Sequence, residues 1–220
     1  SSNHNIAVGW NALGLESSGA NACIAIGKAA LSTQNSTLTS GARYSGDSVN
    51  LAIGFAAGEA VTSGTKNVLI GHEAGSTLVD DSFNTVLGYN ARKGATAGTG
   101  NTVLGADAML GGTATTGDHN VVVGYEAGNA LAGAAGDNTI MGVAALASAN
   151  NAATTGNVAI GRNAGRYYNA GGSDTAMTKA IDSIYIGNNA RGVHATTADN
   201  EIVIGFNAIG AGANSIVLGD

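Results

Sequence analysis

Short runs of apolar residues recur along the chain, and each run ends at a glycine. The unit is Asn, three mostly apolar residues, Gly, two variable residues and Ala, as in the stretch 67–74, Asn-Val-Leu-Ile-Gly-His-Glu-Ala. Eight of the eleven spacings between successive units are 17 to 19 residues, and a period of this length predicts a solenoid. The twelve repeat glycines are Gly9, Gly27, Gly54, Gly71, Gly88, Gly105, Gly124, Gly142, Gly161, Gly187, Gly205 and Gly219.

Each apolar run predicts a short β-strand. Three β-prone residues are bounded by Asn and Gly, two residues that tolerate positive φ and therefore favour turns. Because Asn recurs at the same corner, we expect it to hydrogen-bond its own turn and to stack on the equivalent Asn above and below. A helix is disfavoured because a glycine interrupts every candidate window and the apolar residues do not recur at a spacing of 3.6. In a strand the outer two residues face one side and the middle residue faces the other. Both sides are apolar in most copies, as in buried parallel sheets.

The sequence therefore predicts an all-β fold, a parallel β-solenoid or β-roll of about twelve repeats of 17 to 19 residues. One side of each strand fills the coil, and the other side needs a second surface to cover it. Since the coil is thin, we expect neighbouring copies to provide that cover in an intertwined homotrimeric β-helical fibre. Whether the chains coil individually or interlace stays open at this stage. The array covers residues 1–220 as one domain, with insertions at about 32–47 and 166–181, where the spacing widens to 27 and 26.

Composition and charge narrow the function classes. The chain has 35 glycines, no proline, one cysteine (Cys23) and a net charge of −6. A single cysteine closes no disulfide within the chain, so packing and hydrogen bonding must stabilise it. Nucleic acids and anionic membranes need concentrated positive charge, which is missing, so we expect neither as a partner. No apolar run is long enough for a membrane-spanning helix, and we expect no membrane insertion.

The motifs typical of enzymes were not found. The sequence has no Gly-x-Ser-x-Gly elbow, no phosphate-binding loop and no His-Glu-x-x-His pair. Ser63 and Lys66 match a Ser-x-x-Lys pattern, which is an accidental match in a chain so rich in Ser and Thr. His4 and His119 both precede the repeat Asn, and we interpret them as surface turn residues. We therefore expect no enzyme activity, no metal and no cofactor.

The repeat units, clearest at 183–191 and 200–220, resemble those of bacteriophage tail fibres and tailspikes. They resemble more distantly the heads of trimeric autotransporter adhesins, whose repeat is shorter; only the final spacing here, 14 residues, fits it. The resemblance implies an extracellular homotrimer on the virion that binds a bacterial surface glycan or protein receptor. In such fibres a similar passage often precedes a self-cleaving intramolecular chaperone. This implies a segment of a longer fibre, or a product matured at Asp220.

Eight of the ten aromatic residues fall into two groups, and the other two, Phe83 and Tyr185, lie at other positions of the repeat. One group directly follows the repeat glycine, which predicts a packed or partly exposed column; its members are Trp10, Phe55, Tyr89, Tyr125 and Phe206. The other group lies in the two insertions, and loops that project from a rigid scaffold commonly carry binding residues. The candidate receptor-binding residues are Arg43, Tyr44 and Asp47 in the first insertion and Arg166, Tyr167, Tyr168, Asn169 and Asp174 in the second. The alternative role of these insertions is to seal the trimer interface.

The favoured function is a structural and host-adhesion segment of a trimeric phage tail fibre. A purely structural shaft with the receptor tip elsewhere, a trimeric bacterial surface adhesin and a polysaccharide-degrading tailspike are the alternatives. The tailspike requires two carboxylates at a set separation, and no pair in the sequence can be shown to converge. An ice-binding solenoid is disfavoured because Thr occupies the first strand position only at Thr85, Thr102 and Thr139.

Overall fold

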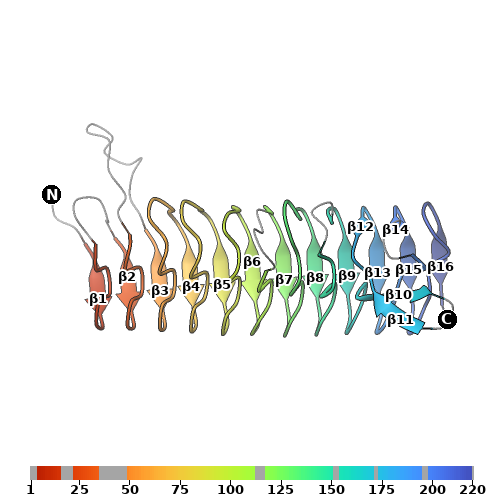
Figure 1. Ribbon diagram of the computed structural model, residues 1–220, viewed down its shortest axis with the longest axis horizontal. Helices are drawn as coiled ribbons and strands as arrows, with labels where there is room; N and C mark the ends of the chain where they lie inside the picture. Colours follow the sequence, from red (N-terminus) through yellow and green to blue (C-terminus); the bar gives the residue numbers. More distant parts are fainter. Residues whose placement is uncertain are drawn as a thin grey trace.

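The computed structural model describes residues 4–15, 22–34, 49–111, 117–150, 154–170, 173–194 and 198–219; the side chains of 168–175 and 198 are not described. These residues form a narrow rod in which short strands stack along the long axis (Figure 1). The described part contains no helix. The predicted all-β parallel solenoid is therefore confirmed.

Twelve strands form one parallel sheet in which each strand pairs with the strand of the next repeat. Every predicted run of three residues is one of these strands. The strands are β1 (Ile6–Val8), β2 (Ile24–Ile26), β3 (Leu51–Ile53), β4 (Val68–Ile70), β5 (Thr85–Leu87), β6 (Thr102–Leu104), β7 (Val121–Val123), β8 (Thr139–Met141), β9 (Val158–Ile160), β13 (Ile184–Ile186), β15 (Ile202–Ile204) and β16 (Ile216–Leu218). The pairing is in register throughout, so that the middle residues Ala25, Ala52 and Leu69 are partners in succession.

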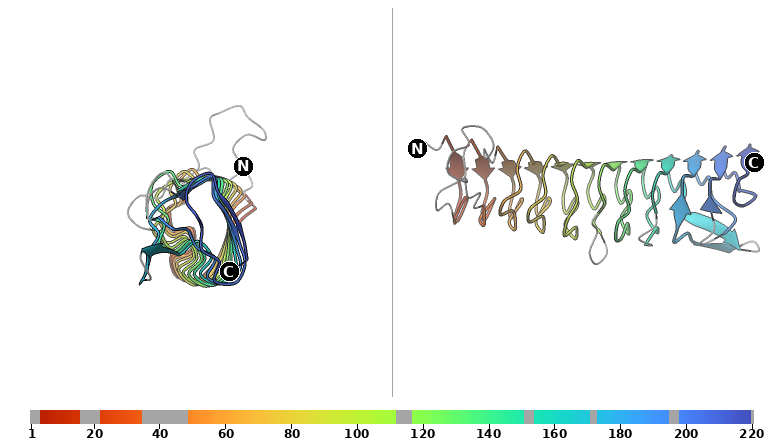
Figure 2. Two further views of the ribbon diagram at one scale, coloured as in Figure 1. Left: turned by 90° about the vertical axis from the view of Figure 1, so that its right-hand side faces the viewer. Right: turned by 90° about the horizontal axis from the view of Figure 1, so that it is seen from above.

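Two further sheets lie at the C-terminal third of the rod. Strands β10 (Tyr167–Ala170) and β11 (Ser173–Ala176) form an antiparallel hairpin, and β12 (Ala180–Ile181) pairs in parallel with β14 (Ala198–Asp199). The hairpin projects from the side of the rod, away from the main sheet (Figure 2). The second predicted insertion is thus a distinct structural element. Most of the first insertion, 35–48, lies outside the described residues.

The core is the interior of the coil. In the ten strands from β2 to β15 that belong to the main sheet, the middle residue is buried and its two neighbours are not. The repeat alanines from Ala30 to Ala208 are buried as well. Because all main-sheet pairing lies within one chain, the chain coils on itself. Intertwining with other chains stays a prediction.

The repeat glycines have a backbone conformation that excludes other residues. From Gly9 to Gly205 their φ angles lie between +127° and +146°. A Cβ atom on Gly88 would lie 2.3 Å from the carbonyl oxygen of Gly105, the equivalent glycine of the next coil. Both the torsion angle and the close stacking of backbones therefore require glycine at this corner.

Other corners place ordinary residues in the left-handed region. From the coil of β2 onward, the residue before the first position of the repeat unit has a positive φ, mostly near +50° to +60°. The second residue after the repeat glycine and, in most coils, the fourth have similar φ angles. At the fourth position after the repeat glycine, Leu31 and Leu146 are buried in the core. In the coil of β4 this position is Gly75, and the side chain of Leu78, three residues later, lies where a side chain on Gly75 would be: a Cβ atom added to Gly75 would lie 2.9 Å from it. The coil therefore fills the same space with one side chain or the other.

The repeat Asn residues form a buried ladder along the rod. Asn84 Oδ1 accepts a hydrogen bond from the backbone N–H of Asn101 (3.0 Å), and Asn101 Oδ1 accepts one from that of Asn120 (3.0 Å). From Asn84 to Asn157 each side-chain amide also donates to its own turn, as from Asn101 Nδ2 to Thr99 O (3.3 Å). The expected stacking of Asn on its equivalents is confirmed. It satisfies polar groups that the thin coil would otherwise bury unpaired.

Candidate functional site

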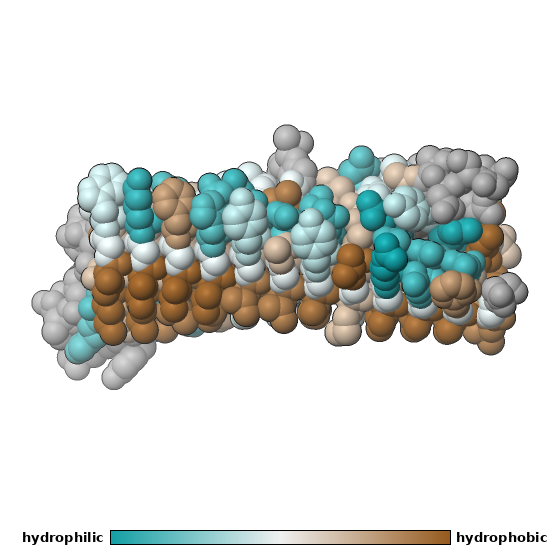
Figure 3. Space-filling model, turned by 90° about the horizontal axis from the view of Figure 1, so that it is seen from below, coloured by the Kyte–Doolittle hydropathy of each residue, from teal (hydrophilic) through white to brown (hydrophobic). Residues whose placement is uncertain are grey.

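The outer face of the main sheet is an apolar surface that runs along the described rod. Each strand places its first and third residues on this face, which makes 24 positions; 21 are aliphatic or Met, and none is charged. The exceptions are Thr85, Thr102 and Thr139, all in the first-position column. Figure 3 shows the face as an apolar band along the rod. We call these 24 positions the sheet face.

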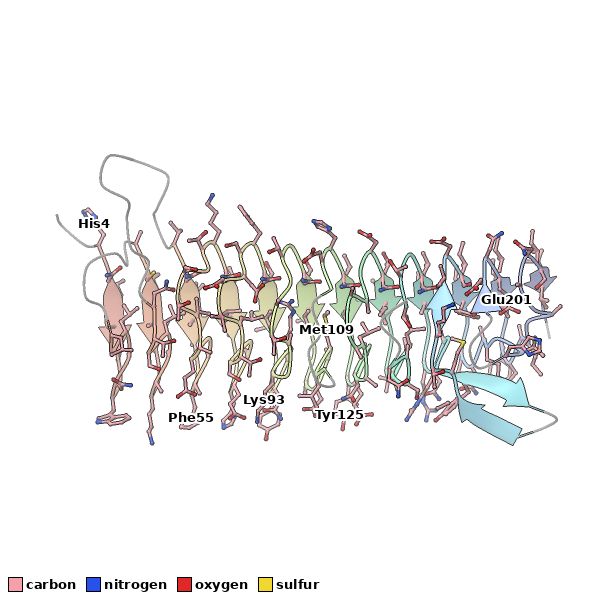
Figure 4. The ribbon with its side chains drawn as sticks, turned by 45° about the horizontal axis from the view of Figure 1, so that its top comes forward. His4, Phe55, Lys93, Met109, Tyr125 and Glu201 are labelled. Carbon is pink, nitrogen blue, oxygen red and sulfur yellow. The ribbon has the colours of Figure 1, made fainter. Side chains whose placement is uncertain are left out.

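The column after the repeat glycines borders the sheet face at one edge of the rod. Phe55 and Tyr125 lie at this edge, whereas His4 lies at the opposite edge (Figure 4). The predicted aromatic column is exposed, with Trp10 72% and Phe206 64% accessible. The sequence predicted a column that is either packed or partly exposed, and the structure shows that it is exposed.

Side chains of this column stack on one another in the N-terminal half. The ring of His72 stacks between Phe55 (centroids 5.0 Å apart) and Tyr89 (5.1 Å). Lys28 Nζ lies between two rings, 5.3 Å from the centroid of Trp10 and 5.6 Å from that of Phe55. Stacking at the strand spacing and cation–π attraction order these exposed side chains along five successive coils.

The candidate receptor residues are only partly described. Arg43, Tyr44 and Asp47 lie outside the described residues. Tyr168, Asn169 and Asp174 lie on the hairpin, with Asn169 opposite Asp174, but only their backbone is described.

The base of the hairpin is better defined. The guanidinium of Arg166 lies over the ring of Tyr167, with 5.0 Å from Cζ to the centroid. The structure therefore brings these two predicted residues together where the hairpin leaves the rod. Arg166 Nη1 also donates to Asn163 Oδ1 (3.1 Å), which ties the hairpin base to the corner of the coil.

A second asparagine ladder, not predicted from the sequence, begins at this point. Asn163 Nδ2 donates to Asn189 Oδ1 (3.0 Å), and Asn189 Nδ2 donates to Asn207 Oδ1 (3.0 Å). These residues stand two after the repeat glycine and are at least partly exposed, unlike the buried ladder. The sequence did contain a signal for this ladder, because Asn occupies the second position after the repeat glycine in three successive units.

Two buried polar clusters lie in the interior, where no macromolecule reaches them. Arg92 is fully buried, and its Nη2 donates to the carbonyl oxygens of Ala97 and Gly98, both at 3.0 Å. Burial lowers the pKa of Arg92 to about 10 and raises the pKa of Asp81, whose Oδ1 accepts from the N–H of Gly98 at 2.6 Å. These bonds fix the turn at 97–98 inside the rod.

Glu201 occupies the ladder position of the coil that contains β15. Its Oε1 accepts from the Gly212 N–H (3.0 Å) and its Oε2 from the Tyr185 hydroxyl (3.2 Å). Burial raises the pKa of both Glu201 and Tyr185. Gly210 provides the space, because a Cβ there would lie 1.7 Å from Glu201 Oε1. This enclosed carboxyl ends the buried ladder and contacts no solvent.

The Ser-x-x-Lys pattern has separate partners in the structure. Ser63 Oγ donates to Asp80 Oδ1 at 2.6 Å, and hydrogen bonds from Ser63 and Thr62 lower the pKa of Asp80. Lys66 Nζ lies over the ring of Phe83, 4.8 Å from its centroid. In the described part of the chain no three His, Cys, Asp or Glu side chains converge as metal ligands. The described residues also include no helix that is long and apolar enough to span a membrane.

Comparisons with protein-family models, with curated proteins and with solved structures found no match for this chain. The functional argument therefore rests on the residues and on the geometry of the rod.

Proposed function

We propose that the chain is a segment of a homotrimeric fibre of the bacteriophage tail-fibre type, carried on the virion, that contributes to adhesion to a bacterial surface. The observation that carries this proposal is the sheet face. It runs the whole length of the described rod, and its residues are aliphatic or Met at 21 of 24 positions. A surface of this kind requires a partner, because water contact with so many aliphatic side chains is unfavourable.

The dimensions of the sheet face favour association along the full rod. Eleven strand spacings of about 4.8 Å make it roughly 53 Å long, and three residues make it about 10 Å wide. This is an area of roughly 530 Å², near the upper end of the largest apolar patches on monomeric proteins, and patches of that size often have a functional role. A second copy of the same solenoid has side chains at the same axial spacing, so that ridges and gaps match over all coils. Copies of this chain are therefore the partner that fits best.

The two columns of the sheet face favour three copies over two. The third-position column is aliphatic or Met in all twelve strands, from Val8 to Leu218, whereas the first-position column contains the three threonines. In a three-chain fibre one column of each face lies closer to the common axis than the other. An entirely apolar column suits that axial position, and a column with some hydroxyl groups suits the outer part of the interface.

A purely structural shaft is the second candidate. The buried Asn ladder, the repeat glycines and the buried alanines all have packing or backbone roles. We therefore assign adhesion to other parts of the rod, namely the hairpin and the exposed corner next to it. Both functions require the same trimer, so the trimer is tested first.

Sedimentation equilibrium tests the proposal. We expect the wild-type chain to have three times the 21.4 kDa mass of one chain. Leu87→Lys with Leu104→Lys adds two charges to the sheet face, and we expect a folded monomer because these side chains point outward. Glu59→Lys is the matched control, since it changes the net charge equally at an exposed site outside the sheet face and should stay trimeric. A monomeric wild-type chain overturns the proposal.

A further inference from the structure

Two arginines at one corner of the rod have no acidic partner among the side chains that the structure describes. Arg162, exposed, directly follows a repeat glycine, and Arg166 stands at the hairpin base. Among the described residues the ion pairs involve His72, Lys93, His119 and Lys179, so neither arginine takes part in one. The chain has 15 acidic residues and a net charge of −6. In such a chain, two arginines without a carboxylate partner indicate that the negative charge comes from outside.

The exposed Asn ladder lies between these arginines and the C-terminal end of the rod. Its side chains are linked in one direction, from Arg166 through Asn163 and Asn189 to Asn207. A side-chain amide has two N–H donors and an oxygen with two lone pairs. These bonds use one donor and one acceptor site of Asn163, the same of Asn189, and one acceptor site of Asn207. The remaining groups are available to hydroxyl groups repeated at the strand spacing.

The backbone does not require asparagine at these positions. All three residues have φ between 55° and 57°, but Ala29, Ala56 and Ala144 occupy the equivalent position with φ between 52° and 58°. The fold thus accepts an apolar methyl group at this corner. The run of three Asn in the coils of β9, β13 and β15 therefore has a role beyond the turn itself.

Charge is segregated along this same corner. The equivalent positions in the coils of β4, β6 and β7 are the acidic residues Glu73, Asp107 and Glu126. The coil of β8 has Val143 and Ala144 instead, which separates the acidic part from the arginines by two coil steps. Two steps are roughly 10 Å, about one Debye length at 0.1 M salt. An anion at the C-terminal part of the corner is therefore largely screened from these carboxylates.

An exposed aromatic ring completes the surface. Phe206, in the coil of β15, is 64% exposed and immediately precedes Asn207. The ring of Tyr167, held by Arg166, lies at the other end of the ladder. Flat apolar faces next to amide and guanidinium groups suit a ligand that has both C–H faces and hydroxyl groups.

We propose that the corner formed by Arg162, Asn163, Asn189, Phe206 and Asn207 binds a carboxylated polysaccharide that extends along the rod axis. The carboxylates pair with the arginines, the hydroxyl groups bond to the Asn ladder, and a sugar ring covers Phe206. This inference rests on the proposed adhesive function and adds its ligand class and its location. Three chains per fibre present three such corners, which raises avidity without a strong single site.

The test measures binding to immobilised polysaccharides by biolayer interferometry. Polygalacturonate, hyaluronate and alginate are the carboxylated probes, and dextran is the neutral probe. We expect the wild type to bind at least one carboxylated probe more strongly than dextran, and this binding to weaken as NaCl rises from 0.05 to 0.5 M. Asn163→Ala, Asn189→Ala and Asn207→Ala together should weaken it roughly tenfold or more, because several hydrogen bonds are lost.

The controls separate binding from folding. Asn11→Ala with Asn90→Ala changes the same repeat position in other coils and should leave binding unchanged. Arg162→Gln should remove the salt dependence in part while the ladder remains. Equal binding of dextran and the carboxylated probes, no binding at all, or full binding by the triple variant overturns the inference. A wild-type chain that sediments as a trimer but fails this test refutes the ligand assignment alone, and the fibre proposal stands.

Discussion

At the scale of single residues, the solenoid depends on backbone torsion angles at its corners. The repeat glycine has a φ angle near +135°, which only glycine adopts without strain, and its Cα lies against the next coil. Two residues later the chain returns to the left-handed region, where alanine, asparagine, glutamate and aspartate all occur. The position of the repeat glycine therefore accepts only glycine. The position two residues later accepts several residue types, and each non-glycine residue there costs about 1 kcal/mol.

Two substitutions at these corners should have opposite effects. Gly88→Ala places a Cβ 2.3 Å from a backbone oxygen at φ +145°, and we expect a loss of at least about 3 kcal/mol in the free energy of unfolding. Ala144→Gly relieves a left-handed alanine (φ 53°) and should gain up to about 1 kcal/mol. Urea denaturation followed by circular dichroism measures both. A Gly88→Ala protein as stable as the wild type would show that the coils can separate at this corner.

Glu201 should make stability depend on pH. Its pKa is raised in the folded state by burial, so the folded chain holds this proton more tightly than the unfolded chain. The contribution to stability is complete below the ordinary glutamate pKa and is lost as pH rises through the raised folded value. Asp81 contributes with the same sign, and Asp80, whose pKa is lowered, with the opposite sign.

Glu201→Gln isolates that contribution, because an amide keeps an oxygen acceptor for the Gly212 N–H. We expect the variant to gain in stability relative to the wild type as pH increases from 4 to 8. Thermal unfolding of both proteins across this range provides the measurement. A stability difference that is constant with pH would mean that Glu201 has an ordinary pKa in the folded chain.

At the scale of elements, the sequence predicted the strands of the main sheet and the glycine turn that ends each of them, but not the other corners of the coil. Alignment on the repeat glycine located all twelve strands, because the same three-residue pattern both forms the strand and fixes its register. It also predicted the buried Asn ladder, since identical residues at one coil position must stack. These features are local and periodic, and a single sequence is enough to reveal them.

Features that break the repeat were harder to predict. Arg92 takes an interior position that Leu31 and Leu146 take elsewhere, and a charged residue inside a thin coil is not expected from its sequence position. The hairpin of the second insertion was expected only as a loop, because its strands pair with each other and do not follow the 17-to-19-residue period. The exposed Asn ladder was missed because its position varies in the other coils.

At the scale of the whole molecule, the rod has distinct longitudinal surfaces. The sheet face is aliphatic, one edge carries the aromatic column, and the corner beside it changes from acidic residues to arginine and asparagine along the axis. In a solenoid, equivalent positions of successive repeats lie in a row along the axis. A residue type that recurs at one position in every coil therefore forms a surface as long as the rod. The central claim is that the sheet face packs on copies of itself, in parallel and in register.

Pulsed electron paramagnetic resonance tests this claim most directly. A nitroxide at Thr102→Cys on the sheet face, in a Cys23→Asn background that restores the repeat residue, reports the distance between chains. In a parallel, in-register trimer the labels come from equivalent coils, and we predict one narrow distribution below roughly 20 Å, since packed sheets lie about 10 Å apart. A label at Glu59→Cys, outside the sheet face, should give longer distances. Absence of any intermolecular distance for the Thr102 label, or distances as long as those at Glu59, would contradict the account.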